Sequence, residues 1–186
     1  MSNYDYDHSL SLFADYCIGR KVPERDYSLI RFGAMGMDMR KVGEPIISKI
    51  LNYEDAPHIH GADSYNPIRK KLVEIKCETQ LPLSGKASWG STKTLEKLHK
   101  LKKENQEYIQ AGFEKKGRLV YIIQKDLNDT DIPSKLLERI EAGSTPPKTG
   151  HKQIGDEFKV LYLNQRFLDN TPISGPFKKK LLANYG

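Results

Sequence analysis

Three ionisable residues in the middle of the chain have types and a spacing that suit them to chemistry on phosphates. They are Asp63, Glu74 and Lys76, and one residue separates the last two. Because side chains alternate across a strand, Glu74 and Lys76 would share a face, with a carboxylate beside an ammonium. Two adjacent carboxylates form a hard-oxygen site suited to Mg²⁺, and a nearby lysine can orient or help to activate a water molecule. This is the equipment for cleaving a phosphodiester bond.

The segments around these residues predict a hairpin that brings them together. The run 72–77 reads as a strand, because β-branched residues alternate with other types along it. Asn66-Pro67 predicts a turn between Asp63 and this strand. The strand can then return alongside Asp63, so we expect the two carboxylates to meet.

This arrangement resembles a known family of nucleases. The pattern is Asp63 followed by Glu74-Ile75-Lys76. It resembles the PD-(D/E)XK nuclease superfamily, which includes the type II restriction endonucleases, over about residues 44–125. It departs at Ala62, where the family pattern has a proline, although that position varies widely in the superfamily. The resemblance implies an α/β fold with a restriction-endonuclease-like core, a central mixed β-sheet flanked by helices in the order αβββαβ.

The resemblance also implies roles for individual residues. Asp63, Glu74 and the backbone carbonyl of Ile75 would coordinate Mg²⁺, while Lys76 would position the attacking water or help to deprotonate it. In the superfamily, an acidic residue from a helix before the hairpin often completes the metal site, and Glu44 is the candidate here. Glu44 with the following proline could equally be an ordinary helix start, because both residue types favour a first helical turn. Glu54 and Asp55 are weaker rivals for the same role.

Hydrophobic patterning predicts the elements that follow the hairpin. An apolar stripe predicts a helix over 94–113 with Thr94 as its N-cap, and a buried strand follows at 118–124. A strand, a crossover helix and a strand make a βαβ unit, so we expect 118–124 to lie parallel to 72–77 in a mixed sheet. Helices are also predicted at 9–18 and 132–141, and a last strand at 158–163.

Two polar segments, 78–93 and 143–153, have the Pro, Gly, Ser and Lys content of irregular loops. Recognition usually resides on loops held by a rigid scaffold, so we expect base readout within them, at 80–93 and 145–153. For the segment 143–153 a mobile linker is the alternative. The candidate DNA contacts are Lys86, Ser88, Trp89, Lys93, Lys148, His151, Lys152 and Gln153 in these segments, with Lys97 and Lys100 on the basic helix between them. For Trp89 a buried anchor is favoured over a DNA contact. For the basic helix a solvated face is the alternative. Lys178 to Lys180 near the carboxyl end read as a basic arm.

Length and composition bound these interpretations. A chain of 186 residues suits one domain, and we expect a single nuclease domain over 1–186, with its core at about 44–125 and an extension at about 143–186 that contacts DNA. The net charge of +6 fits a polyanionic partner. Cys17 and Cys77 suggest neither a metal site nor a disulfide framework. The polar amino terminus is unlike a signal peptide and no apolar run approaches a membrane span, so we expect a cytoplasmic protein without membrane contact.

The leading hypothesis is a Mg²⁺-dependent endonuclease that hydrolyses double-stranded DNA, as a sequence-specific type II restriction enzyme does. The sequence lacks a Gly-x-x-x-x-Gly-Lys-Ser/Thr loop, which favours a stand-alone enzyme over a multi-activity machine. Cutting both strands of a palindrome needs two sites, so a homodimer is expected. The alternatives are a junction or repair nuclease of the same superfamily, a non-catalytic DNA-binding protein, and a basic protein bound to RNA or another acidic macromolecule.

Overall fold

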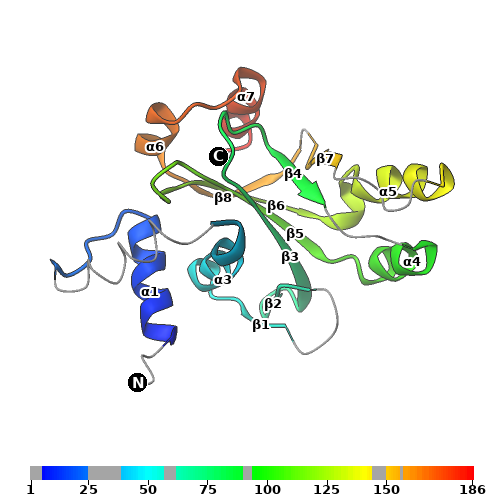
Figure 1. The fold of residues 1–186 in the computed structure, drawn as a ribbon, viewed down its shortest axis with the longest axis horizontal. Coiled ribbons are helices and arrows are strands. Elements are labelled where there is room, and N and C mark those ends of the chain that lie inside the picture. The colour runs from blue at the N-terminus through cyan, green and yellow to red at the C-terminus, as the bar shows by residue number, and fades with distance from the viewer. Residues whose placement is uncertain (1–5, 25–38, 57–61, 90–93, 144–149, 156) are drawn as a thin grey trace.

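A six-stranded mixed sheet forms the centre of the computed structural model, which describes residues 6–24, 39–56, 62–89, 94–143, 150–155 and 157–186 (Figure 1). Its strands lie in the order β1-β2-β3-β5-β6-β8. Their bounds are β1 (Glu54–Asp55), β2 (Ser64–Asn66), β3 (Lys71–Glu78), β5 (Glu107–Phe113), β6 (Leu119–Asp126) and β8 (Lys159–Leu163). Of the neighbouring pairs in this sheet, β3 and β5 run parallel and the others are antiparallel.

Helices flank both faces of this sheet. The described helices are α1 (Tyr6–Cys17), α3 (Met39–Leu51), α4 (Leu95–Glu104), the 3-10 helix η2 (Leu127–Asp129), α5 (Ile132–Glu141), α6 (Gln165–Asn170) and α7 (Gly175–Ala183). The predicted α/β class, with a central mixed sheet flanked by helices, is confirmed. None of the described helices is long and apolar enough to cross a membrane.

Strand β5 separates two hydrophobic clusters, one on each face of the sheet. It is buried along its whole length, and successive residues alternate between the clusters. Tyr108 packs with the residues of α4 to α7, whereas Ile109 and Ala111 pack with the residues of α1 and α3. A strand buried on both faces carries an almost continuous apolar run, which explains its sequence.

The hairpin predicted around Asn66-Pro67 is confirmed, since β2 pairs antiparallel with β3 across that turn. The predictions at 9–18, 132–141 and 158–163 are also confirmed, as α1, α5 and β8. The predicted helix 94–113 was right in its first half, where the Thr94 side chain accepts a hydrogen bond from the Lys97 N–H at 3.3 Å. Its second half was wrong. Helix α4 ends at Glu104, Asn105 adopts a left-handed C-cap with φ 44°, and the chain continues as β5.

This error also misplaced the strand pairing. The predicted strand 118–124 is β6, but it lies antiparallel to β5, and the parallel partner of β3 is β5 itself. The helix expected to open at Glu44 is α3, which begins five residues earlier at Met39. Glu44 and Pro45 therefore lie inside α3, and the reading of Glu44 as a helix-start acid was wrong.

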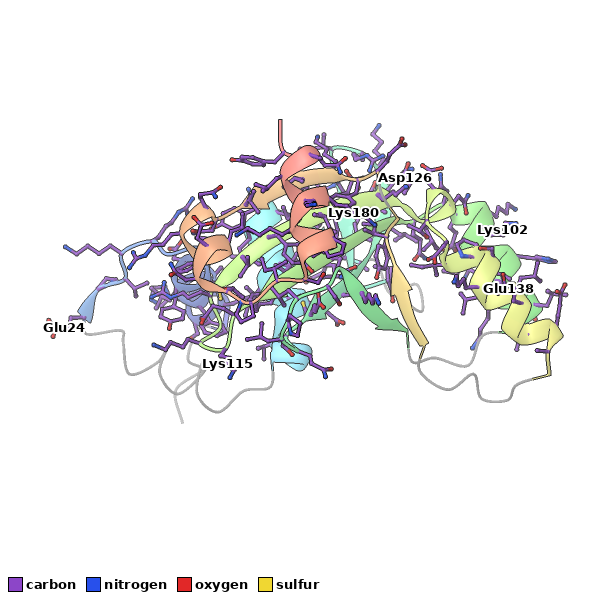
Figure 2. The ribbon with its side chains drawn as sticks, turned by 90° about the horizontal axis from the view of Figure 1, so that it is seen from above. Glu24, Lys102, Lys115, Asp126, Glu138 and Lys180 are labelled. Atoms are coloured by element: carbon purple, nitrogen blue, oxygen red, sulfur yellow. The ribbon has the colours of Figure 1, made fainter. Side chains whose placement is uncertain are left out.

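Strands β4 (Lys86–Trp89) and β7 (Gly150–Gln153) form a separate antiparallel pair, which we call the ribbon. It stands apart from the main sheet in the view from above (Figure 2). Each strand comes from a segment predicted to be irregular, so that prediction was wrong at these residues. The buried side chains of Leu83 and Ile154 anchor the base of the ribbon in the core. Lys178 to Lys180, predicted as a basic arm, lie within α7.

Candidate active site

The edge of β3 is where Asp63 meets the strand. Strand β2 pairs with residues 71–73 only, and the Asp63 N–H extends the pairing by one bond, to the Val73 carbonyl at 2.9 Å. The next backbone N–H along β3 on this side, that of Ile75, donates its hydrogen bond to the Asp63 side chain, at 2.6 Å from Oδ2. The carboxylate is therefore fixed beside the middle of β3.

Four oxygen-bearing groups surround the ammonium of Lys76. Its Nζ lies 2.7 Å from Glu74 Oε1 and donates to the Ile75 carbonyl at 2.8 Å. The Oδ2 of Asp63 and the Oε1 of Glu44 each lie 3.7 Å from the same nitrogen. We call Glu44, Asp63, Glu74 and Lys76 the Lys76 cluster. The structure thus brings together all the residues that the sequence assigned to catalysis and metal binding.

Close packing of α3 on β3 places Glu44 at this cluster. A Cβ atom at Gly43 would lie 2.5 Å from the Cys77 sulfur, so a larger residue there would push the helix away. Ser48, one turn further along α3, donates its hydroxyl to the Glu44 carbonyl at 3.0 Å and hydrogen-bonds the hydroxyl of Ser64 on β2. The helix and the hairpin are thereby tied together next to the carboxylates.

The charges of the cluster shift the pKa values of two members. Burial lowers the pKa of Lys76, but the neighbouring Glu74 and Asp63 carboxylates outweigh this effect, and the net shift is upward. Lys76 therefore holds its proton firmly in this arrangement. Burial and the charge of Asp63 raise the pKa of Glu44, which makes it readier to take up a proton. Burial also raises the pKa of the Cys77 thiol, so this cysteine is a poor nucleophile.

The donor set of the cluster suits a hard cation. Three carboxylates and one backbone carbonyl offer only oxygen ligands, the kind that Mg²⁺ prefers. The carboxylates also outnumber the one ammonium, so the cluster carries an excess of negative charge. Among the described residues, no three His, Cys, Asp or Glu side chains are grouped as a ready metal site. The Lys76 ammonium lies among these oxygens, at 2.7 to 3.7 Å from each of them.

The candidate DNA contacts fall into three groups. Strand β4 carries Lys86, Ser88 and Trp89, and strand β7 carries His151, Lys152 and Gln153. The two segments meet in the ribbon, where Lys86 pairs with Gln153 and Ser88 with His151. On α4, Lys97 and Lys100 are exposed, and Lys100 lies 3.7 Å from Glu104. The remaining two, Lys93 and Lys148, lie outside the described residues.

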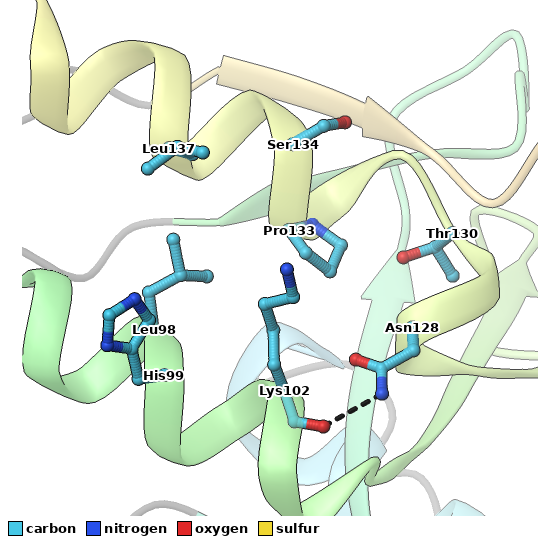
Figure 3. Close-up of a pocket in the computed structure, with 8 residues that line it drawn as sticks. All are labelled: Leu98, His99, Lys102, Asn128, Thr130, Pro133, Ser134 and Leu137. Carbon is cyan, nitrogen blue, oxygen red and sulfur yellow. Dashed lines mark hydrogen bonds between the residues drawn. The ribbon is translucent and has the colours of Figure 1, made fainter.

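A cleft of about 270 Å³ lies between α4 and α5 (Figure 3). The residues that line it are Leu98, His99, Lys102, Asn128, Thr130, Pro133, Ser134 and Leu137. Its walls are mainly apolar, and no member of the Lys76 cluster contributes to them. The cleft and the Lys76 cluster are therefore separate features of the described structure.

Sequence analysis missed a second group of charges, at the other end of the hairpin. Its centre is Glu107 at the start of β5, which is 1% exposed and accepts from the Tyr53 hydroxyl at 2.6 Å and the Asn66 amide at 3.0 Å. Arg69 contacts both Glu107 at 3.1 Å and Asp126 at 2.9 Å. Lys71 lies 2.7 Å from Asp126. We call these six residues the Glu107 cluster: Tyr53, Asn66, Arg69, Lys71, Glu107 and Asp126.

A third buried carboxylate, Glu78, closes the far end of β3. It accepts hydrogen bonds from the backbone and hydroxyl of Ser84 at 2.8 Å each, from the Gly85 N–H at 3.1 Å and from the Tyr121 hydroxyl at 2.7 Å. These bonds fix the chain where it leaves β3 for the ribbon. The available sequence signal was an acidic residue next to an apolar run, with Glu78 at the end of one run and Glu107 at the start of another.

The arrangement at the Lys76 cluster can bind a cation through oxygen, donate a hydrogen bond from an ammonium, and take up a proton on a carboxylate. These abilities come from residues of β3, of α3 and of the segment before β2. A scan against protein-family models and a search of curated proteins found no match to this chain.

Proposed function

We propose that this protein is a Mg²⁺-dependent endonuclease that hydrolyses phosphodiester bonds of double-stranded DNA, as type II restriction enzymes do. The observation that carries the proposal is the convergence of Glu44, Asp63, Glu74 and the Ile75 carbonyl on the Lys76 ammonium. Oxygen ligands around one point of positive charge, beside a lysine, supply the parts needed for hydrolysis at a phosphate.

The order of elements supports the same proposal. From α3 to β5 the main-sheet elements follow as α3, β1, β2, β3, α4 and β5, which is the αβββαβ order that the resemblance to the PD-(D/E)XK superfamily implies. The ribbon strand β4 is an addition between β3 and α4. Asp63 precedes the second strand of this series, while Glu74 and Lys76 lie on the third, so the motif and its setting agree.

Asp63, Glu74 and the Ile75 carbonyl would hold Mg²⁺, and Glu44 would contribute from α3. When bound, the ion would lower the pKa of a coordinated water and stabilise negative charge on the phosphate. Because its neighbours raise the pKa of Lys76, this residue acts as a hydrogen-bond donor that positions the water or a phosphate oxygen. Glu44, whose pKa is also raised, is the carboxylate best suited to receive a proton.

The DNA would be held by basic residues outside the cluster. Lys97 and Lys100 on α4 would neutralise phosphates, and the ribbon residues Lys86, Ser88, His151, Lys152 and Gln153 would bind phosphates or base edges. Symmetric cleavage of both strands would require two copies of the site, so the active form would be a homodimer in the cytoplasm.

The test is incubation of long mixed-sequence duplex DNA with the protein, in Mg²⁺ or in a chelator. We expect discrete fragments in Mg²⁺ and intact DNA in the chelator. Glu74→Gln should abolish the fragments, whereas Glu138→Gln, an exposed carboxylate change on α5 labelled in Figure 2, should leave them unchanged. Metal-independent cleavage, or full activity of Glu74→Gln, would contradict the proposal. Cleavage of branched DNA alone would identify the structure-specific nuclease of the same superfamily.

A further inference from the structure

The turn between β2 and β3 displays an isoleucine to solvent. Ile68 is 89% exposed, more than any other exposed large hydrophobic residue in the described part of the chain. Pro67 precedes it, and Arg69 and the exposed Lys70 follow. Single exposed apolar residues are common on protein surfaces, so exposure by itself indicates nothing. The informative observation is how firmly this turn is held.

The Asn66 side chain fixes the backbone of the turn through hydrogen bonds. Its side-chain oxygen accepts hydrogen bonds from the Ile68 and Arg69 N–H groups, both at 3.1 Å. Its amide nitrogen donates to the Tyr53 hydroxyl at 3.1 Å and to Glu107 Oε2 at 3.0 Å. One buried side chain therefore joins the turn to β5.

The guanidinium of Arg69 holds the turn through two ion pairs. It reaches Glu107 at 3.1 Å and Asp126 at 2.9 Å, which come from two further strands of the sheet. Pro67 restricts the backbone before Ile68, because its ring fixes φ. Ile68 is thus presented on a support that is already ordered, and binding through it would cost little conformational entropy.

The position of the turn relative to the Lys76 cluster suggests what Ile68 contacts. Strand β3 leads directly from the turn to Glu74, and the three residue steps from Lys71 to Glu74 span about 10 Å. That length corresponds to about three base pairs along a duplex. DNA-binding proteins insert apolar side chains, isoleucine among them, between base steps, with basic residues on the adjacent phosphates. The exposed Lys70 supplies such a basic neighbour.

We propose, on the basis of the nuclease function above, that Ile68 is a wedge that enters a base step of bound duplex DNA a few base pairs from the hydrolysed phosphate. Lys70 binds a phosphate beside the wedge. The Glu107 cluster keeps the turn in the same conformation when Ile68 inserts. The partner is duplex DNA, and the insertion unwinds it locally.

Plasmid unwinding tests this proposal without any cleavage. Closed circular plasmid is relaxed by a metal-independent topoisomerase in the presence of the protein and Ca²⁺, which supports binding but activates water poorly. The DNA is then freed of protein, and its linking number is read on a gel. We expect the wild-type protein to lower the linking number, and Ile68→Ala to lose at least half of that change. Ile68→Leu should keep it.

The matched control is Leu182→Ala, which removes another exposed apolar side chain, on α7, far along the chain from the turn. All variants are compared at concentrations that shift the same fraction of plasmid in a mobility assay. Because Ile68 is almost fully exposed, its replacement leaves the core intact. Equal unwinding by Ile68→Ala and the wild type, or binding by the wild type without unwinding, overturns the wedge.

The outcome is separable from that of the proposed function. Ile68-dependent unwinding by a protein that never cleaves DNA in Mg²⁺ would support the wedge and refute the nuclease. Mg²⁺-dependent cleavage without unwinding would refute the wedge and leave the nuclease standing.

Discussion

The Lys76 cluster and the Glu107 cluster both combine carboxylates with cationic side chains on the β2–β3 hairpin, yet they differ in charge balance. The Lys76 cluster sets three carboxylates around one ammonium, with side chains 11–35% exposed. In the Glu107 cluster, two carboxylates meet two cations, and Glu107 is 1% exposed with Tyr53 and Asn66 also bonded to it. A buried charge is tolerated when it is fully paired. Balanced pairing therefore fits a structural role, whereas the Lys76 cluster has an excess of carboxylate charge, which the cation of our proposal would neutralise.

The largest expected effect separates the two clusters by activity. Lys76→Met should lower the rate of Mg²⁺-dependent cleavage by at least about 1000-fold, because it removes the group that we propose donates a hydrogen bond beside the reacting phosphate. Lys71→Met, the matched change in the Glu107 cluster, should lower it by less than about tenfold, because Lys71 acts only through the turn. Fragment yield against time on duplex DNA measures both. Comparable losses from the two variants would show that the clusters do not differ in role.

A second comparison concerns stability. Glu107→Ala should lower the free energy of unfolding by about 3 kcal/mol, because it leaves the groups that pair with this buried carboxylate without a partner. We take the lower end of the usual range since the Arg69 side chain is 36% exposed and can turn to water. Glu44→Ala should change the free energy by less than about 1 kcal/mol. Urea denaturation followed by circular dichroism gives both values, and a larger loss from Glu44→Ala would invert the assignment.

The smallest effect is a pH dependence at Glu44. Burial and Asp63 raise the pKa of this carboxyl in the folded chain, so the folded state retains a proton that the unfolded state has already lost. Stability therefore falls as pH rises from the ordinary carboxyl pKa through the raised one. Glu44→Gln removes this penalty, so the variant should melt at a slightly higher temperature at pH 7. The gain in the free energy of unfolding should be less than about 0.5 kcal/mol, because the Glu44 side chain is 35% exposed.

Thermal melts from pH 3.5 to pH 8 would test this dependence, with the exposed Glu138→Gln as the control. The gain of Glu44→Gln should vanish at the acidic end, where both states are protonated. A variant that melts lower than the wild type at pH 7 would show that the attraction of Lys76 outweighs burial at this position.

The sequence predicted the hairpin that carries the site because its signals are local. Alternating β-branched residues and the Asn66-Pro67 turn need no distant partner to be recognised. The placement of Asp63 beside Ile75 follows from that hairpin. The same reasoning failed at β5, where the run Tyr108–Phe113 has apolar residues on both faces and can be read as a helix or as a buried strand. Asn105, a suitable left-handed C-cap, was the local sign that the helix ends.

The Glu107 cluster and the ribbon could not be predicted in this way because their partners lie far apart in the chain. Glu107 contacts Tyr53 across 54 positions. Neither β4 nor β7 has a strand pattern of its own, and each becomes a strand only through pairing with the other. Alternation within one segment carries no information about such contacts.

The ribbon also has a consequence for the order in which the molecule assembles. Pairing of Lys86 with Gln153 closes a long stretch of chain that contains α4, β5, β6 and α5. Closing a long loop costs conformational entropy, and two strands alone are marginally stable in water. We therefore expect the ribbon to form after Leu83 and Ile154 are fixed in the core, late on the folding pathway. Its local opening is governed by those two anchors, so a core substitution at either one would loosen the ribbon without altering any of its own residues.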